Sequence, residues 1–313
     1  MKTRPAPARR PSLLRVATHL APGVEPAYAR IARCIGDALG RPAELVVAAD
    51  YGRCAADLDH VCFVCSVPYL LLRAAGSIRM EVAAAPVLAG PRYGGRPVYF
   101  SDVVVRADSR FRRFEDLRGT RWAFNEPYSH SGFVVVLHHL AVLGASPDFI
   151  GTGIEAGFHD EALRMVVDGR ADWAAIDSQV LAIWMRQVPS LRRRVRVIEA
   201  LGPSTIQPVV ASSRRLGAAA RQAVTEVLLG VHDDPSVRPD LAAAGIERFV
   251  TARDEDYEDI RVKLVAASVS GLLPAWWLPR WQRIVSSTDD ALDQARSTIG
   301  LTSPIQRSSV SAS

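Results

Sequence analysis

Short apolar runs alternate with segments of helical periodicity along most of this chain, and the alternation predicts an α/β fold. In the N-terminal part we expect strands at 13–18, 44–49 and 61–66, helices at 25–39 and 67–74, and extended segments at 79–88 and 99–106. The middle part is expected to form strands at 121–124, 149–154, 172–176 and 196–199, with helices at 131–143, 160–168 and 178–187. A strand at 208–212 and helices at 214–231 and 237–244 follow.

The middle set of elements interrupts the N-terminal set, which indicates two lobes, each a mostly parallel sheet flanked by helices. We expect lobe 1 to combine residues 12–102 with 208–300, lobe 2 to span 103–207, and flexible tails at 1–11 and 301–313. The chain crosses between the lobes near Val103 and near Gln207, and such paired crossings can act as a hinge. Open α/β sheets bind ligands at the carboxyl ends of their strands, so the sequence predicts a cleft between the lobes.

Composition excludes several classes of protein. The chain has 313 residues, 49% hydrophobic and 23% charged, as in ordinary globular proteins. The net charge is +5, and the basic residues are almost all Arg. The runs of Arg are separated along the sequence and lack interleaved aromatic residues, so we expect no nucleic-acid partner. No apolar run reaches the length of about 18 residues that a membrane span needs.

The basic, Pro-rich segment 1–11 is not followed by a continuous apolar stretch, so no secretion signal is recognisable. We therefore expect either a cytoplasmic protein or an exported precursor that starts differently.

The four cysteines include one Cys-x-x-Cys pair, Cys62 and Cys65. This pair lies in an apolar run, and strand residues three apart point to opposite faces, which is poor geometry for a chelate or a disulfide. We expect buried thiols, no metal site and no cofactor.

The segment 122–132, Trp-Ala-Phe-Asn-Glu-Pro-Tyr-Ser-His-Ser-Gly, carries the strongest functional signal. It predicts a buried strand, a tight turn and the first residues of a helix. Ser129, His130, Ser131 and Gly132 lie at that helix N-terminus, where backbone N–H groups carry partial positive charge and hydroxyl groups add neutral donors. The arrangement favours binding of a tetrahedral oxyanion; the alternative is an ordinary Ser N-cap.

Two further polar residues follow predicted strands of the same lobe. His159 stands at a strand-to-helix turn and can donate to an oxyanion. Asp177 comes directly after the buried strand 173–176, and can accept from a protonated phosphoryl oxygen or pair with a ligand ammonium group. For Asp177 the alternative is an N-cap of the next helix, and for His159 it is an N-cap or surface position.

These segments resemble the PhnD-like phosphate/phosphonate-binding proteins of ABC transporters. The resemblance rests on Asp116–Gly119, Ser129–Gly132, Gly157–His159 and Gly169–Asp177, with weaker matches at 64–69, 99–104 and 202–209, and covers roughly residues 12–250. It implies a two-lobed, type II periplasmic-binding-protein-like receptor that closes on a phosphonate or phosphate, works with a transporter permease, and resides in the periplasm.

The resemblance also implies site residues. The family's hydroxyl-rich loop corresponds to Ser129, His130 and Ser131, with His130 at a position that often holds a small hydroxyl residue. Aromatic residues from the first lobe correspond to Tyr51, Tyr69 and Tyr99, and Ser101 can add a donor on the strand face of Tyr99. For each Tyr the alternative is core packing.

The function we expect is non-catalytic capture of a small oxyanion, a phosphonate or phosphate ester, by neutral donors. The alternatives are an enzyme acting on a small metabolite and a cytoplasmic ligand sensor with the same cleft. The loop at 129–132 is not a Gly-x-Ser-x-Gly nucleophile turn, which argues against the enzyme. The tryptophan cluster near 276–281 is expected to cover apolar surface of lobe 1.

Overall fold

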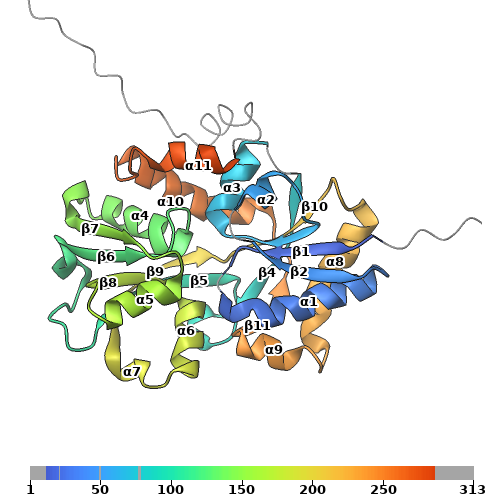
Figure 1. The fold of residues 1–313 in the computed structure, drawn as a ribbon, viewed down its shortest axis with the longest axis horizontal. Helices are drawn as coiled ribbons and strands as arrows, with labels where there is room; N and C mark the ends of the chain where they lie inside the picture. The colour runs from blue at the N-terminus through green and yellow to red at the C-terminus, as the bar shows by residue number, and fades with distance from the viewer. Residues whose placement is uncertain (1–11, 21, 49–50, 77–78, 286–313) are drawn as a thin grey trace, which may run out of the picture.

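The computed structural model describes residues 12–20, 22–48, 51–76 and 79–285; both predicted tails, and the end of predicted lobe 1 at 286–300, lie outside the described residues. Two β-sheets lie side by side, each flanked by helices (Figure 1). The first sheet consists of β1 (Leu14–Thr18), β2 (Ala43–Val47), β3 (Val61–Phe63), β4 (Met80–Leu88), β10 (Val209–Ser212) and β11 (Ile246–Val250). The second consists of β5 (Val98–Arg106), β6 (Thr120–Phe124), β7 (Ile150–Glu155), β8 (Trp173–Asp177) and β9 (Val195–Thr205).

Both sheets are mixed, which corrects the expectation of mostly parallel sheets. In the first sheet, in the order β11-β4-β10-β3-β1-β2, only β1 with β2 and β1 with β3 are parallel pairs. In the second, in the order β7-β6-β8-β5-β9, β5 runs antiparallel to both β8 and β9. β10 runs antiparallel to β4 because the chain leaves the first sheet after β4 and re-enters it at the same end, at the start of β10.

Helices cover both faces of the sheets. The helices are α1 (Glu25–Ala38), α2 (Gly52–Ala55), α3 (Ser66–Ala74), α4 (Val135–Val142), α5 (His159–Val167), α6 (Ser178–Gln187), α7 (Leu191–Arg194), α8 (Ala218–Gly230), α9 (Arg238–Ala243), α10 (Glu258–Val269) and α11 (Trp277–Val285). α1, α8 and α9 pack together on one side of the first sheet, while α5 and α6 pack on the second (Figure 1). The amphipathic α1 shows the reason: Tyr28, Ile31 and Ile35 lie on one face and are buried.

The chain passes between the sheets at 89–97, before β5, and at 206–208, after β9. β5 belongs to the second sheet from its first residue, Val98, and pairs with β9 along its whole length. β9 corresponds to the strand expected at 196–199 but is much longer. It continues to Thr205 because it pairs with β5 along the whole length of β5.

The C-terminal helices α10 and α11 contact both halves of the molecule (Figure 1). α10 packs against α3 and also against α4 and β9. On α11, the Trp277 indole N–H donates to the carbonyl of Pro127 at 2.7 Å, and the Trp281 ring packs against Tyr51 and Tyr128. The tryptophan cluster therefore covers the loop after β6 as well as lobe 1, which corrects the expectation of lobe 1 alone.

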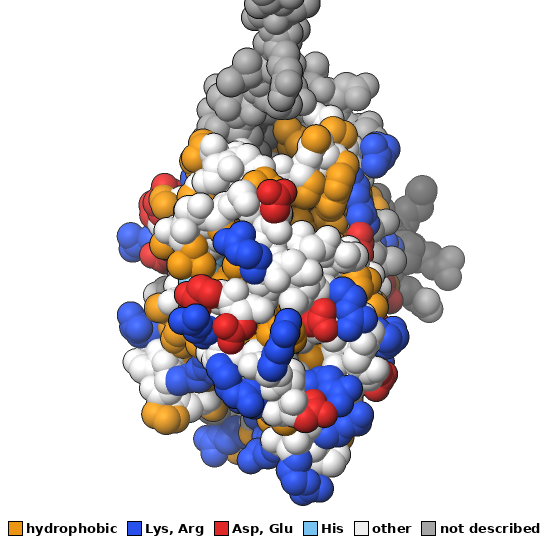
Figure 2. Space-filling view, turned by 90° about the vertical axis from the view of Figure 1, so that its left-hand side faces the viewer, with side chains coloured by type: hydrophobic (Ala, Val, Ile, Leu, Met, Phe, Trp, Pro, Cys, Tyr) orange, Lys and Arg blue, Asp and Glu red, His pale blue; other side chains and the backbone are white. Residues whose placement is uncertain are grey.

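One face of the second lobe carries side chains of both charges. Arg and Lys side chains are interspersed with Asp and Glu on the face shown in Figure 2. Within the described part of the chain, no helix has both the length and the apolar character that a bilayer span requires.

Candidate functional site

The loop after β6 ends in a widened helical turn. The sequence predicts a regular helix at 131–143, but residues His130–Val134 form a π-helical turn, η4, and α4 begins only at Val135. Ser129 caps this turn, because its hydroxyl oxygen accepts a 3.0 Å hydrogen bond from the Gly132 N–H. Such single π-turns occur frequently at functional sites.

Gly132 allows the loop to fold tightly on itself. A Cβ atom at this position would lie 1.8 Å from the side-chain oxygen of Asn125, far inside van der Waals contact. Asn125 is buried, and its side-chain oxygen has no hydrogen-bond partner among the described residues. Glycine at 132 therefore lets Asn125 pack against the turn, where its amide faces the same region as Ser129.

Ser131 and His159 form the centre of the site. The hydroxyl oxygen of Ser131 lies 3.0 Å from Nε2 of His159 and 3.5 Å from the hydroxyl oxygen of Ser129. His159 is the first residue of α5, and burial lowers its pKa to about 4. The imidazole is therefore neutral at pH 7, and its Nδ1 has no partner among the described residues. The three side chains offer hydrogen-bonding groups without a fixed positive charge.

Asp177 ends β8 and caps α6. One carboxylate oxygen accepts from the N–H groups of Gln179 (2.7 Å) and Val180 (3.4 Å), and the other accepts from the Gln207 side-chain amide at 2.9 Å. Burial raises the pKa of Asp177 to about 6 despite these bonds. The capping role that the sequence left open is present, and the residue also lines the cavity described below.

Glu126 links the two lobes at the other side of the site. The Tyr51 hydroxyl of the first lobe donates a short hydrogen bond to the Glu126 carboxyl group. Burial raises the pKa of Glu126 to about 7, although this hydrogen bond acts in the opposite direction. The ring of His19, which follows β1, stacks on Tyr51 with centroids 5.1 Å apart.

These groups surround a cavity between the lobes. Its volume of about 50 Å³ holds on the order of four water molecules. The lining comes from the first lobe (His19, Leu20, Val24, Tyr28, Cys65), from the second lobe (Asn125, Glu126, Ser129, Ser131, His159, Asp177, Gln179, Val180) and from the passage at Gln207. No Lys or Arg occurs among these described lining residues. The turn at 129–132 thus faces an opening shared by both lobes.

Four of the ten predicted site residues, Ser129, Ser131, His159 and Asp177, line this cavity. Three of the other six contact residues of the lining or of the turn. Gly132 supports the turn, Tyr51 holds Glu126, and the Ser101 hydroxyl donates to the backbone carbonyl of Ser131.

The remaining three point elsewhere. His130 faces away, with Nε2 2.9 Å from the hydroxyl of Ser204, and burial lowers its pKa to about 3, with the Lys263 charge acting in the same direction. The Tyr69 hydroxyl donates to Asp254 at 2.6 Å. Tyr99 is buried beside His130.

Several lining residues were missed by sequence reasoning. Asn125 and Glu126 directly follow the strand that the sequence predicts, so their position at a strand carboxyl end was a usable signal. His19 likewise follows the first strand. Tyr28, in α1, and Gln207 carried no local signal, because they reach the cavity only through the packing of the lobes.

Among the described residues, the single group of side chains close enough to share a metal ion is His19, Cys54 and Cys62. Only His19 belongs to the cavity lining.

Comparison with known proteins agrees with this architecture. A family model described as ABC transporter, phosphonate, periplasmic substrate-binding protein matches residues 18–257. A search of curated protein sequences returned no significant match.

Solved structures share the two-lobed type II periplasmic-binding-protein fold. PhnD1 from Prochlorococcus marinus (MIT 9301), in complex with methylphosphonate, has a TM-score of 0.71 at 15% identity, over 80% of this chain and 96% of that chain. A binding protein component of an ABC phosphonate transporter from Pseudomonas aeruginosa has a TM-score of 0.71 at 15% identity, over 93% of this chain and 98% of that chain. The alkanesulfonate-binding protein SsuA from Xanthomonas axonopodis pv. citri, bound to MOPS, has a TM-score of 0.57 at 18% identity, over 85% of this chain and 96% of that chain.

The family model covers most of the chain, and the fold agrees with it. The chain therefore belongs to the periplasmic phosphonate substrate-binding proteins of ABC transporters, a family of binding proteins and not of enzymes.

Proposed function

We propose that this protein captures a small phosphonate or phosphate-type oxyanion in the cavity between its lobes. The observation that carries the proposal is the cluster of Ser129, Ser131 and His159 at the first turn of a helix, facing side chains of the other lobe. The first backbone N–H groups of a helix lack carbonyl partners within it and attract anions, although in this turn the Gly132 N–H donates to the Ser129 hydroxyl and the Val134 N–H to the Ser129 carbonyl. Hydroxyl and imidazole donors bind an oxyanion without the desolvation cost of a buried cation.

The charge of the lining restricts the ligand further. Glu126 and Asp177 bring carboxyl groups into a cavity without a described Lys or Arg. An ionised carboxylate repels a phosphonate dianion, whereas it attracts an ammonium group on the same ligand. We therefore propose a preference for a zwitterionic aminoalkylphosphonate over a plain alkylphosphonate at pH 8, where both carboxyl groups are ionised.

A second cavity of about 240 Å³ offers room for the organic part of the ligand. It shares Val24 and Val180 with the first cavity and extends along Ile183 and Trp184 on α6. These side chains are apolar, so a carbon chain that leaves the oxyanion site through this opening would remain in van der Waals contact with the protein.

We propose that the lobes divide at the two passages, 89–97 and 206–208, and close on the ligand about them. The first passage precedes the division expected near Val103, because β5 belongs to the second sheet from Val98. Tyr51 bonds Glu126 across the lobes, which is a contact that a closed form would keep, and the closed form would deliver its ligand to an ABC-transporter permease in the periplasm. The family to which the chain belongs supports this assignment.

A panel of ligands tests the proposal. Phosphate, sulfate, methylphosphonate and 2-aminoethylphosphonate are compared by thermal shift at pH 8, and the affinity of each active compound is then measured. A ligand that binds only the folded state raises the melting temperature, and 2-aminoethylphosphonate should raise it most. Glu126→Gln should reduce the preference for 2-aminoethylphosphonate over methylphosphonate about tenfold, because Gln still accepts from Tyr51 but has no charge.

Glu258→Gln, an exposed substitution on α10, is the matched control and should leave the preference unchanged. The proposal fails if no compound of the panel changes the melting temperature.

A further inference from the structure

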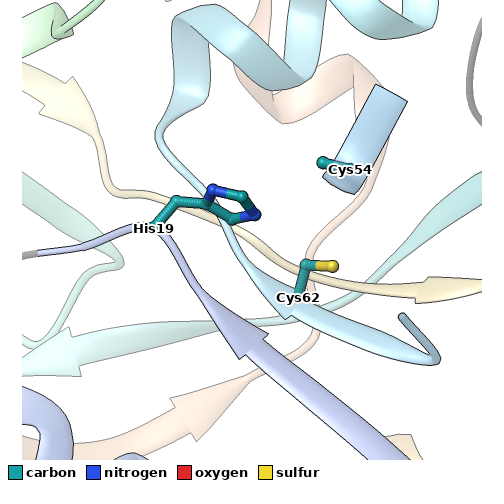
Figure 3. A group of neighbouring side chains, drawn as sticks. All are labelled: His19, Cys54 and Cys62. Carbon is teal, nitrogen blue, oxygen red and sulfur yellow. The ribbon is translucent and has the colours of Figure 1, made fainter. Parts of the chain in front are cut away.

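A cluster of soft ligand atoms lies next to the cavity. His19 follows β1, Cys54 lies in α2 and Cys62 lies in the middle of β3 (Figure 3). One nitrogen of His19 and the two sulfur atoms all lie within 4.8 Å of one another. A third sulfur is adjacent, because Sδ of Met80 is 3.9 Å from Sγ of Cys54. The Cys-x-x-Cys motif is not involved as a pair, since Cys65 lies at the start of α3 beside the cavity.

The separations are close to those of a ligated metal. Zinc bonds of about 2.3 Å to sulfur and about 2.0 Å to nitrogen place tetrahedral ligand atoms roughly 3.5–3.8 Å apart. The cluster thus needs to contract by about 1 Å at its widest separation, within the reach of side-chain rotation. Its backbone is already fixed, because the His19 N–H donates to the Phe63 carbonyl at 2.9 Å.

The local charge also favours a cation. Cys54 and Cys62 are fully buried, and the neighbouring Asp57 is buried with neither carboxylate oxygen bonded to another described residue. Asp57 exerts a negative field on Cys62, while the charge of Asp59 is paired with the Arg53 guanidinium at 2.6 Å. With Zn²⁺ the two thiolates neutralise the ion, so the zinc-loaded site adds no net charge to the interior, whereas with Cu⁺ the loaded site keeps one negative charge.

We propose that His19, Cys54 and Cys62 bind one thiophilic closed-shell cation, Zn²⁺ or Cu⁺, with Met80 at the edge of the site. Thiolate and thioether ligands select these soft ions over Mg²⁺ or Ca²⁺. The site shares His19 with the lining of the proposed oxyanion cavity, but its occupancy does not require a phosphonate. It departs from the expectation of no metal, which considered only the Cys-x-x-Cys pair.

The proposal is tested on the reduced, metal-free full-length protein without any phosphonate. Zn²⁺ is titrated in competition with a chromophoric chelator, and Cu⁺ is titrated anaerobically in the same way. One equivalent of at least one of the two ions should bind. The ion that binds more tightly is the one for which the site is selective. Cys54→Ala and Cys62→Ala should each weaken binding at least a hundredfold, and His19→Ala at least tenfold. Cys34→Ala, in α1 and partly exposed, is the matched control and should bind like the wild type.

A second measurement does not depend on the folding of the variants. Co²⁺ bound by the wild-type protein should show thiolate-to-metal charge-transfer absorption together with the visible bands of tetrahedral Co²⁺. The proposal is overturned if neither Zn²⁺ nor Cu⁺ binds in a 1:1 ratio, if the cysteine variants bind as tightly as the wild type, or if bound Co²⁺ shows no thiolate band. A Cys54–Cys62 disulfide in the native protein, with no metal binding after reduction, also overturns it.

Discussion

The hydroxyl oxygen of Ser131 lies 3.0 Å from Nε2 of His159, although 28 positions separate the two residues in the chain. The contact joins the turn after β6 to the start of α5, which follows β7. The Ser101 hydroxyl on β5 fixes the same turn from a third strand through the Ser131 carbonyl. The hydrogen-bonding groups of the site are thus positioned before a ligand arrives, which lowers the entropic cost of binding.

Gly132→Ala should damage the turn from which Ser129 and Ser131 project. The added Cβ would lie 1.8 Å from the Asn125 oxygen, so the loop must move. We expect a loss of about 1–3 kcal/mol in the free energy of unfolding and no measurable ligand binding. Gly230→Ala, an exposed glycine with no atom within 4 Å of the added Cβ, is the control and should be neutral or slightly stabilising. Denaturant unfolding and calorimetric titration measure both effects, and wild-type affinity in Gly132→Ala would contradict the role of the turn.

The affinity for a plain anion of constant charge should rise as the pH falls. Burial raises the pKa of Glu126 to about 7 and of Asp177 to about 6, so both carboxyl groups gain protons between pH 8 and pH 5. Each proton removes a negative charge that repels the anion, and the expected gain for methanesulfonate is about tenfold or more. The pKa of His159, at about 4, keeps it neutral over this range.

Glu126→Gln separates the contributions of the two carboxyl groups, because it removes the titration of Glu126 and leaves that of Asp177. Its pH profile for methanesulfonate should be flatter than that of the wild type. Superimposable profiles would show that Glu126 does not act on the ligand.

Trp281→Ala should destabilise the protein and weaken ligand binding together. The Trp281 ring is 1% exposed and packs against Tyr128 of the loop after β6 and against Tyr51, which holds Glu126. Removal of such a buried ring costs about 3–5 kcal/mol and lowers the melting temperature by roughly 10 °C. Trp276→Ala, at a position 45% exposed, should change the melting temperature by only a few degrees. A fully stable Trp281→Ala variant with normal affinity would show that α11 does not support the site.

The parts of the fold that follow from local periodicity were predictable from the sequence. Helices such as α1 and α5 lie close to their predicted positions because their buried faces repeat with the helical period. The antiparallel strands were not predictable, since apolar composition does not encode strand direction. The π-turn at His130–Val134 was missed for a related reason: residues 133–137 are all apolar and carry no period that locates the first regular turn.

Some residues of the site could be predicted from the sequence, and others could not. Ser129, Ser131, His159 and Asp177 follow strands of one lobe, so their convergence at one sheet edge could be inferred from order along the chain. The contributions of Tyr28 and Gln207 depend on how the two lobes meet, which is a tertiary property.

The tyrosines illustrate the limit of the resemblance. Tyr51 lies beside the cavity, whereas the Tyr69 hydroxyl binds Asp254, because the direction of each side chain is decided by packing.

The most direct test of an oxyanion site built from neutral donors is calorimetric titration of the wild type, Ser131→Ala and Ser270→Ala with the phosphonate that binds most tightly in the panel. A hydrogen bond to a charged group contributes about 1.5–3 kcal/mol, so Ser131→Ala should weaken binding roughly 10- to 100-fold. Ser270→Ala, an exposed serine at the end of α10, should bind like the wild type. Equal affinity in all three proteins would contradict the account.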